Sequence, residues 1–254
     1  MTNIIVTFDL WDTVFIDDSD EAIRAERGMP TKFEARRQLV HAALNEHAGD
    51  RGPVSREAVD IAYRTADTAY NRVWHDHAVT WTVPARLELV LAGVGRELPP
   101  AAFAKLVQDH EDMELHLPPR LAAGIVEPIR ELARKYTLGV VSDTIFSPGR
   151  ALRQILGNYG IVDCFSAFAF SDEVGCSKPA AGMFEAIAQQ TGAPLKSIVH
   201  IGDRLTKDID GPHTVGARGV LTTVVKTRNE EGDAPDATVH DYADLIRVID
   251  SLAS

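Results

Sequence analysis

The fold of this protein is decided near the start of its chain, by the stretch Ile4-Ile5-Val6-Thr7-Phe8-Asp9-Leu10-Trp11-Asp12-Thr13. Its first five residues are apolar or β-branched, which is typical of a strand buried on both faces of a parallel sheet. The strand ends at Asp9, and more polar residues follow it. Ligands bind at the carboxyl ends of the strands in open parallel sheets, so we expect Asp9 to lie at a functional site.

The region from residue 17 to residue 116 has the residue spacing that is typical of helices. Phe33–Val40 and Arg56–Tyr70 are amphipathic at helical spacing, and Ser55 is placed to cap the second of these segments. Strand-like runs are absent from the sequence of this region. We therefore predict an all-helical domain over 17–116, inserted after the first strand.

Strands and helices alternate through the rest of the chain. Apolar runs at 138–142, 167–171, 198–202 and 219–224 are separated by helical segments, and a last helix is expected near the carboxyl end. Such alternation predicts parallel βαβ units with right-handed crossovers. Residues 1–16 and 117–254 are thus expected to form one discontinuous α/β domain around a parallel sheet. The polar stretch 226–236 is expected to be an exposed turn.

Polar residues follow several of the predicted strands. Ser142 and Asp143 end the second strand, Gly202-Asp203 ends a later one with Asp208 further along, and Lys178 lies in a loop before a helix. Carboxylate oxygens suit a hard cation such as Mg²⁺, and a lysine complements the charge of a phosphate group. The pattern therefore predicts a site for Mg²⁺ and phosphate at this edge of the sheet.

This ordered set resembles the haloacid dehalogenase-like (HAD) hydrolase superfamily, whose members are mostly Mg²⁺-dependent phosphatases. The resemblance covers the whole α/β part, and implies a Rossmann-like core with the helical insertion as a C1-type cap that supplies substrate specificity. The four family motifs are matched, in order, by Asp9 with Thr13, by Ser142, by Lys178, and by Gly202-Asp203 with Asp208.

The resemblance also implies a role for each matched residue. Asp9 would attack phosphorus and form an aspartyl-phosphate that water hydrolyses, with a small phosphorylated molecule as the substrate. Asp208 would hold Mg²⁺ directly or through water. The implied residues are Asp9, Ser142 and Lys178 in catalysis, Ser142, Asp143 and Lys178 in substrate binding, and Asp9, the Trp11 carbonyl, Asp203 and Asp208 at the metal.

Trp11 departs from the family pattern. In the family a second aspartate at this position serves as general acid and base, and an indole cannot transfer that proton. Asp12 is adjacent to Trp11, and whether it takes the role of the missing acid stays open. General acid–base help is worth about 10²–10⁴ in rate. We therefore expect the protein to favour phosphates with good leaving groups over alkyl phosphomonoesters.

Two other functions stay open. The 2-haloacid dehalogenases of the family also lack the second aspartate, because a halide leaves without a proton, although Gly202-Asp203 and Asp208 resemble the metal-binding version of the last motif. The other alternative is a catalytically impaired HAD fold that acts as a binding or regulatory protein, and Trp11 is the feature that favours it.

Composition excludes several classes of protein. Acidic residues outnumber basic ones, 37 against 26, so the net charge is −11, which disfavours binding to nucleic acid or to an anionic membrane. Neither a membrane span nor a signal peptide is expected from the apolar runs. Two cysteines, Cys164 and Cys176, fit a reduced cytoplasmic setting. Whether the protein forms a homodimer stays open.

Several residues of the helical region are candidates for contact with the substrate. Trp74, His77 and Trp81 are the aromatic candidates, and packing against the sheet domain is the alternative for them. Arg24, Arg27 and Arg36 could contact an anionic substrate, but we expect them to lie on a solvated helix face.

Overall fold

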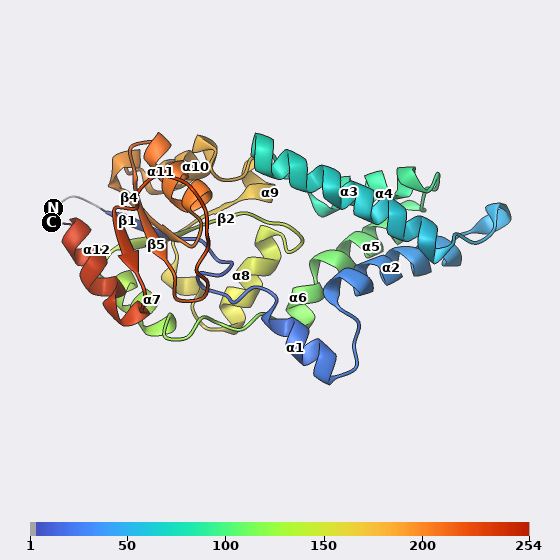
Figure 1. The fold of residues 1–254 in the computed structure, drawn as a ribbon, viewed down its shortest axis with the longest axis horizontal. Helices are drawn as coiled ribbons and strands as arrows, with labels where there is room; N and C mark the ends of the chain where they lie inside the picture. Colours follow the sequence, from blue (N-terminus) through green and yellow to red (C-terminus); the bar gives the residue numbers. More distant parts are fainter. Residues whose placement is uncertain (1–3, 254) are drawn as a thin grey trace.

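The computed structural model describes residues 4–253 and contains one sheet of six parallel strands in the order β3-β2-β1-β4-β5-β6 (Figure 1). The strand order reverses at β1, whose neighbours are β2 and β4, and ligands bind at such switch points. The α/β prediction is confirmed. The strands are β1 (Ile5–Phe8), β2 (Thr137–Ser142), β3 (Ala167–Phe170), β4 (Ile198–Gly202), β5 (Arg218–Thr222) and β6 (Ala237–Val239).

Helices cover both faces of the sheet (Figure 1). Successive strand residues point to opposite faces, so Val6 packs with α7, α8 and α12 whereas Ile5 packs with α10. The elements that alternate with the strands are α7 (Val126–Lys135), α8 (Gly149–Asn158), η2 (Val162–Cys164), α9 (Ser171–Val174), α10 (Ala181–Thr191), η3 (Leu195–Ser197), the π-helix η4 (Leu205–Ile209), α11 (Asp210–Thr214), η5 (Tyr242–Asp244) and α12 (Leu245–Ala253).

Between β1 and α7 the chain forms helices and no named strand within the described residues. They pack around their own apolar cluster, which includes Val40, Tyr63 and Leu87, and they project beyond the sheet in Figure 1. The division at residues 16 and 116 into two domains stays a prediction. These helices are α1 (Ser19–Glu26), α2 (Lys32–Glu46), η1 (Gly49–Arg51), α3 (Arg56–His77), α4 (Val83–Gly93), α5 (Pro100–Glu111) and α6 (Met113–His116).

Two side-chain caps set where the long helices of the insertion begin. The Ser55 hydroxyl accepts a hydrogen bond from the Ala58 N–H, so the predicted cap of α3 is confirmed. At the start of α2, Thr31 and Glu34 each accept a hydrogen bond from the backbone N–H of the other. Each cap satisfies N–H groups that have no partner inside the helix.

The region before the last helix differs from the prediction. Residues 237–239 form β6, which pairs with β5 and is too short to show a strand pattern in the sequence. As a separate finding, no helix within residues 4–253 has the length and apolar character that a bilayer crossing requires.

The buried His110 in α5 predicts a loss of stability in mild acid. Burial lowers its pKa to about 4 from the ordinary 6.5, and its ring stacks on Tyr63 of α3. The unfolded chain therefore binds the proton first as the pH falls, and unfolding becomes easier between pH 6.5 and 4. We expect about 3 kcal/mol of the free energy of unfolding to be lost over this range through His110.

Urea unfolding at a series of pH values measures this effect. His110→Phe keeps the ring and should flatten the pH dependence, whereas His47→Phe, at an exposed position after α2, should leave it as in the wild type. An unchanged slope in His110→Phe would show that another group carries the acid sensitivity.

Candidate active site

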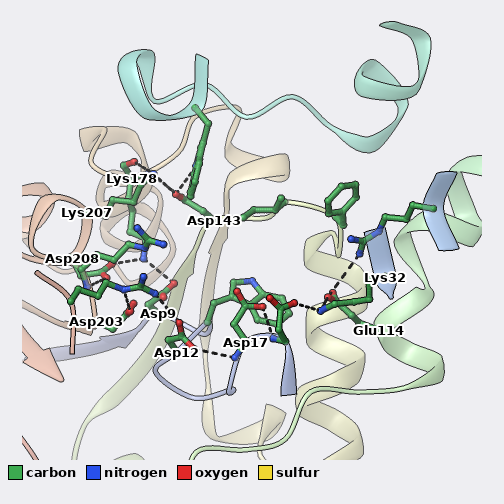
Figure 2. Close-up of a pocket in the computed structure, with 18 residues that line it drawn as sticks. Asp9, Asp12, Asp17, Lys32, Glu114, Asp143, Lys178, Asp203, Lys207 and Asp208 are labelled. Atoms are coloured by element: carbon green, nitrogen blue, oxygen red, sulfur yellow. Dashed lines mark hydrogen bonds and ion pairs between the residues drawn. The ribbon is translucent and has the colours of Figure 1, made fainter. Parts of the chain in front are cut away.

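The carboxyl ends of β1 and β4 bring three buried carboxylates together (Figure 2). Asp9 follows β1 directly, Asp203 follows β4, and Asp208 lies in η4. One carboxylate oxygen from each residue lies within 4.8 Å of the others. The Asp9 N–H donates to the carbonyl of Ile201 at 2.8 Å, which continues the pairing of the two strands into the site.

Asp208 reaches this cluster because its turn is held tightly. One of its oxygens accepts the N–H of Arg204 at 2.9 Å, and the other lies 3.1 Å from Nε2 of the buried His200. Its side chain packs against Gly202, where an added Cβ would lie 2.2 Å from Cγ of Asp208. Glycine is therefore required at position 202 because a larger side chain would collide with Asp208, and not because of its backbone conformation.

Lys178 places one buried ammonium between two of the carboxylates. Its Nζ lies 2.9 Å from Oδ1 of Asp9 and also pairs with Oδ1 of Asp208. Burial opposes the charge, but Asp208 and Asp9 outweigh it and raise the pKa of Lys178. Conversely, Lys178 holds the pKa of Asp208 well below its ordinary value against the effect of burial. Lys178 and Asp208 therefore form a charged pair.

The same lysine does not balance all three negative charges. Burial raises the pKa of Asp9, and burial with repulsion from Asp208 raises the pKa of Asp203 to about 7. A divalent cation among the three would relieve this cost, and an all-oxygen set of this size suits Mg²⁺. Asp9, Asp203 and Asp208 therefore fit a metal of this kind.

Two hydroxyls of the predicted motifs are buried without a partner. Oγ of Ser142 and Oγ1 of Thr13 find no hydrogen-bond partner among residues 4–253. An unpaired buried hydroxyl costs free energy, so each of them has a hydrogen bond left to donate to a ligand oxygen that reaches it. Ser142 ends β2, and both residues are fully buried and are not among the residues that line the cavity.

Asp143 lines the cavity, but its carboxylate is engaged by protein groups. Oδ1 accepts the Lys178 N–H at 2.9 Å. Oδ2 accepts Nε1–H of Trp74 and Nζ of Lys207, each at 3.0 Å. The Lys207 ammonium also lies 3.7 Å from the centroid of the Trp74 ring. The predicted contact of Asp143 with substrate stays untested, and its geometry suits the positioning of Lys178 and Trp74.

The comparison with known families agrees with this geometry. Residues 5–216 match the family described as haloacid dehalogenase-like hydrolase. The chain belongs to this family. It is therefore a hydrolase.

Individual relatives share most of the length of this HAD-like hydrolase. A glyceraldehyde 3-phosphate phosphatase from Methanopyrus kandleri is 27% identical over 229 residues, which cover 87% of this chain and 90% of the relative. A 2-haloacid dehalogenase structure from Pseudomonas syringae has a TM-score of 0.65 at 19% identity, over 99% of this chain and 100% of that one. A HAD hydrolase from Bacillus subtilis, solved bound to magnesium, has a TM-score of 0.58 at 18% identity, over 98% and 99%. The two structures show a shared fold.

The position at which we expect a departure from the HAD pattern lies at the cavity. Trp11 lines it and packs edge-on against Phe15, with ring centroids 5.9 Å apart. The neighbouring Asp12 has a left-handed backbone, with φ of 53°. Its two oxygens accept hydrogen bonds from the Asp17 N–H at 3.1 Å and from Nη2 of Arg228 at 2.7 Å. Asp12 is therefore placed as an acceptor, which argues against its serving as a proton donor.

Arg228 is a residue of the site that sequence reasoning missed. Its Nε pairs with Asp203, and its Nη2 binds Asp12, so one guanidinium joins the first and last motifs. It comes from 226–236, the stretch interpreted as an exposed turn. A single arginine in a polar loop has no periodic pattern that would have identified it.

The helical insertion contributes some of the predicted residues and not others. Trp74 lines the cavity, whereas His77 and Trp81 are not among its lining residues. The expectation of a solvated face was wrong for Arg24 and Arg36, which are both buried. Arg24 pairs with Asp20 four residues earlier in sequence, and Arg36 lines the cavity. Helical spacing alone did not show which face of each helix meets the sheet domain.

The close contact at Gly202 predicts a selective loss of metal binding. In Gly202→Ala the new methyl group must displace the Asp208 carboxylate, and we expect Mg²⁺ to bind about 10–100-fold more weakly. Calorimetric titration with Mg²⁺ measures this, with thermal unfolding as a check on folding.

Gly157→Ala is the matched control. Its added Cβ would meet Val162 at an ordinary 3.7 Å within α8, and alanine favours the helix. This variant should bind Mg²⁺ as the wild type does and be equally or more stable. Equal Mg²⁺ affinity in both variants would contradict the role given to Gly202.

Proposed function

We propose that this HAD-like hydrolase is a Mg²⁺-dependent phosphatase of small phosphorylated molecules. The observation that carries the proposal is the buried cluster of Asp9, Asp203 and Asp208 around the Lys178 ammonium. A carboxylate nucleophile beside fixed positive charge is suited to phosphoryl transfer. The similarity to the phosphatase from Methanopyrus kandleri supports the same class of reaction.

The residues of the site would divide the reaction between them. A carboxylate oxygen of Asp9 attacks phosphorus, the bond from phosphorus to the leaving oxygen breaks, and an aspartyl-phosphate results. Lys178 offsets charge on Asp9, and the unpaired hydroxyl of Ser142 would donate a hydrogen bond to a phosphoryl oxygen. Water then attacks the aspartyl-phosphate, releases inorganic phosphate and restores the carboxylate.

Mg²⁺ would be held by the three clustered carboxylates together with the Trp11 carbonyl. When bound, it supplies positive charge that offsets the repulsion between the carboxylates and the phosphoryl group. The raised pKa values of Asp9 and Asp203 support this assignment, because burial and repulsion from Asp208 make their charged forms costly and a bound cation would offset that cost.

Trp11 sets the preference among substrates. The indole lines the cavity and has no proton to give to a departing alkoxide. Aryl phosphates and acyl phosphates leave as stable anions and need little help of this kind. We therefore infer that the enzyme favours good leaving groups.

Asp9→Asn tests the nucleophile. The amide cannot form the aspartyl-phosphate, so hydrolysis of p-nitrophenyl phosphate and acetyl phosphate should fall to background. Beryllium fluoride with Mg²⁺ mimics the aspartyl-phosphate and should bind the wild type and not this variant, as followed by fluorine NMR. Residual hydrolysis above background in Asp9→Asn would assign the reaction to another residue.

Trp11→Asp tests the leaving-group preference. A carboxyl at this position supplies the missing acid, so the ratio of kcat/KM for p-nitrophenyl phosphate to that for methyl phosphate should fall by about 10²-fold or more. Trp11→Phe removes the indole without adding an acid and should keep the wild-type ratio. The inference is wrong if the wild type hydrolyses the two esters equally well.

A 2-haloacid dehalogenase is the second candidate. Its specific support is again Trp11, because attack of Asp9 on carbon expels a halide that needs no proton. Activity on 2-chloropropionate that persists in excess EDTA would favour this function over phosphate hydrolysis. A binding or regulatory protein is favoured instead if a broad panel of phosphates shows no Mg²⁺-dependent hydrolysis.

A further inference from the structure

The cavity at Asp9 extends to a second group of charges on the helical insertion. Lys32 and Arg36 of α2 and Glu114 of α6 line the same cavity, whose volume is about 220 Å³. In Figure 2, Lys32 and Glu114 lie on the side of the cavity opposite Asp9 and Asp203. A substrate with its phosphoryl group at Asp9 would therefore direct its other end toward these residues.

Lys32 and Glu114 already have partners within the protein. Nζ of Lys32 lies 2.9 Å from Asp18, 3.0 Å from Asp20 and 3.0 Å from Glu114. The other oxygen of Glu114 accepts a hydrogen bond from Ser147. Lys32 and Glu114 are therefore hydrogen-bonded within the protein without a ligand.

Arg36 differs from them, because its guanidinium is buried and incompletely paired. Its side chain is 7% exposed, and its Nη2 lies 4.0 Å from the nearer oxygen of Glu114, beyond hydrogen-bond distance. Its Nε has no hydrogen-bond partner among the residues that the structure describes. A buried guanidinium in this state is costly unless an anion completes its hydrogen bonds.

The Phe146 ring fixes the orientation of this guanidinium. Cζ of Arg36 lies 3.5 Å from the ring centroid, and Cζ of Arg86 lies 3.9 Å from it. Arg86 is satisfied by the carbonyl of Ile145 at 2.7 Å and by Asp67. Stacking on a ring uses the face of a guanidinium and leaves its N–H groups for hydrogen bonds, and a guanidinium suits a planar, two-oxygen acceptor.

We propose that Arg36 binds a second anionic group of the substrate, a carboxylate or a second phosphate, at the end of the cavity remote from Asp9. The proposal rests on the proposed function, because it places the phosphoryl group at Asp9. It narrows the substrate class to small phosphorylated molecules that carry another anion, and excludes those whose remaining part is uncharged.

Binding of stable phosphonates in the presence of Mg²⁺ tests the proposal without catalysis. The probes are phosphonoacetate, 3-phosphonopropionate and 4-phosphonobutyrate, each compared with the uncharged alkylphosphonate of the same length. Alkane diphosphonates of matching length form a second arm, which separates a carboxylate from a phosphate as the preferred anion. Isothermal titration calorimetry gives Kd for each probe.

At least one doubly anionic probe should bind the wild type about tenfold or more tightly than its uncharged counterpart. Arg36→Gln should abolish this preference, and Arg36→Lys should keep part of it. Arg37→Gln is the matched control and should keep all of it, because Arg37 pairs with Asp60 at 3.2 Å and stacks on Phe33. Circular dichroism checks that each variant is folded.

The outcomes separate this proposal from the proposed function. If the wild type binds the alkylphosphonates and the doubly anionic probes equally, or if folded Arg36→Gln keeps the preference, the role of Arg36 is wrong and the phosphatase proposal stands. If no phosphonate binds with Mg²⁺ and no phosphate is hydrolysed, the proposed function is wrong, and the proposal for Arg36 is overturned with it.

Discussion

Repulsion among three buried carboxylates is the constraint on which the rest of the site depends. Asp9, Asp203 and Asp208 come together because the strands that carry the first two are neighbours in the sheet. Lys178 and Arg228 offset part of the charge, while burial, together with repulsion from Asp208, raises the pKa of Asp9 and of Asp203. Asp208 reaches the other two carboxylates because Gly202 has no side chain to obstruct it. The surrounding structure holds the three carboxylates close together against their mutual repulsion.

The segment after β2 joins this carboxylate cluster to the helical insertion. Four of its residues contact helices of the insertion, so neither part of the chain forms the cavity alone. Displacement of the segment would disturb both ends of the cavity together. The contacts are Asp143 with Trp74, Ile145 with Arg86, Phe146 with Arg36 and Arg86, and Ser147 with Glu114.

The sequence allowed the sheet, and the edge at which its carboxylates gather, to be predicted for one physical reason. Buried parallel strands leave continuous apolar runs, and polar residues directly after such runs must lie at one edge, as Asp9 and Asp203 do. Arg228 and Arg36 could not be predicted in this way. Arg228 lies in an irregular loop. Arg36 shares its helix with Lys32 and Arg37, and the sequence alone does not separate it from them. Its contact with Phe146 in the folded chain shows that it reaches the cavity. Strand β6 is too short to show a pattern.

Helix α3 has a mechanical consequence for the molecule. It runs for 22 residues from Arg56 to His77, a rod about 33 Å long, and it contacts the site through Trp74, close to one end. The other end lies far from the sheet in Figure 1. A tilt of about 10° around the Trp74 contact would move that far end by about 5 Å, because about 27 Å of helix separates the two. A small displacement at the hydrogen bond between Trp74 and Asp143 would therefore correspond to a larger displacement at the far end of α3.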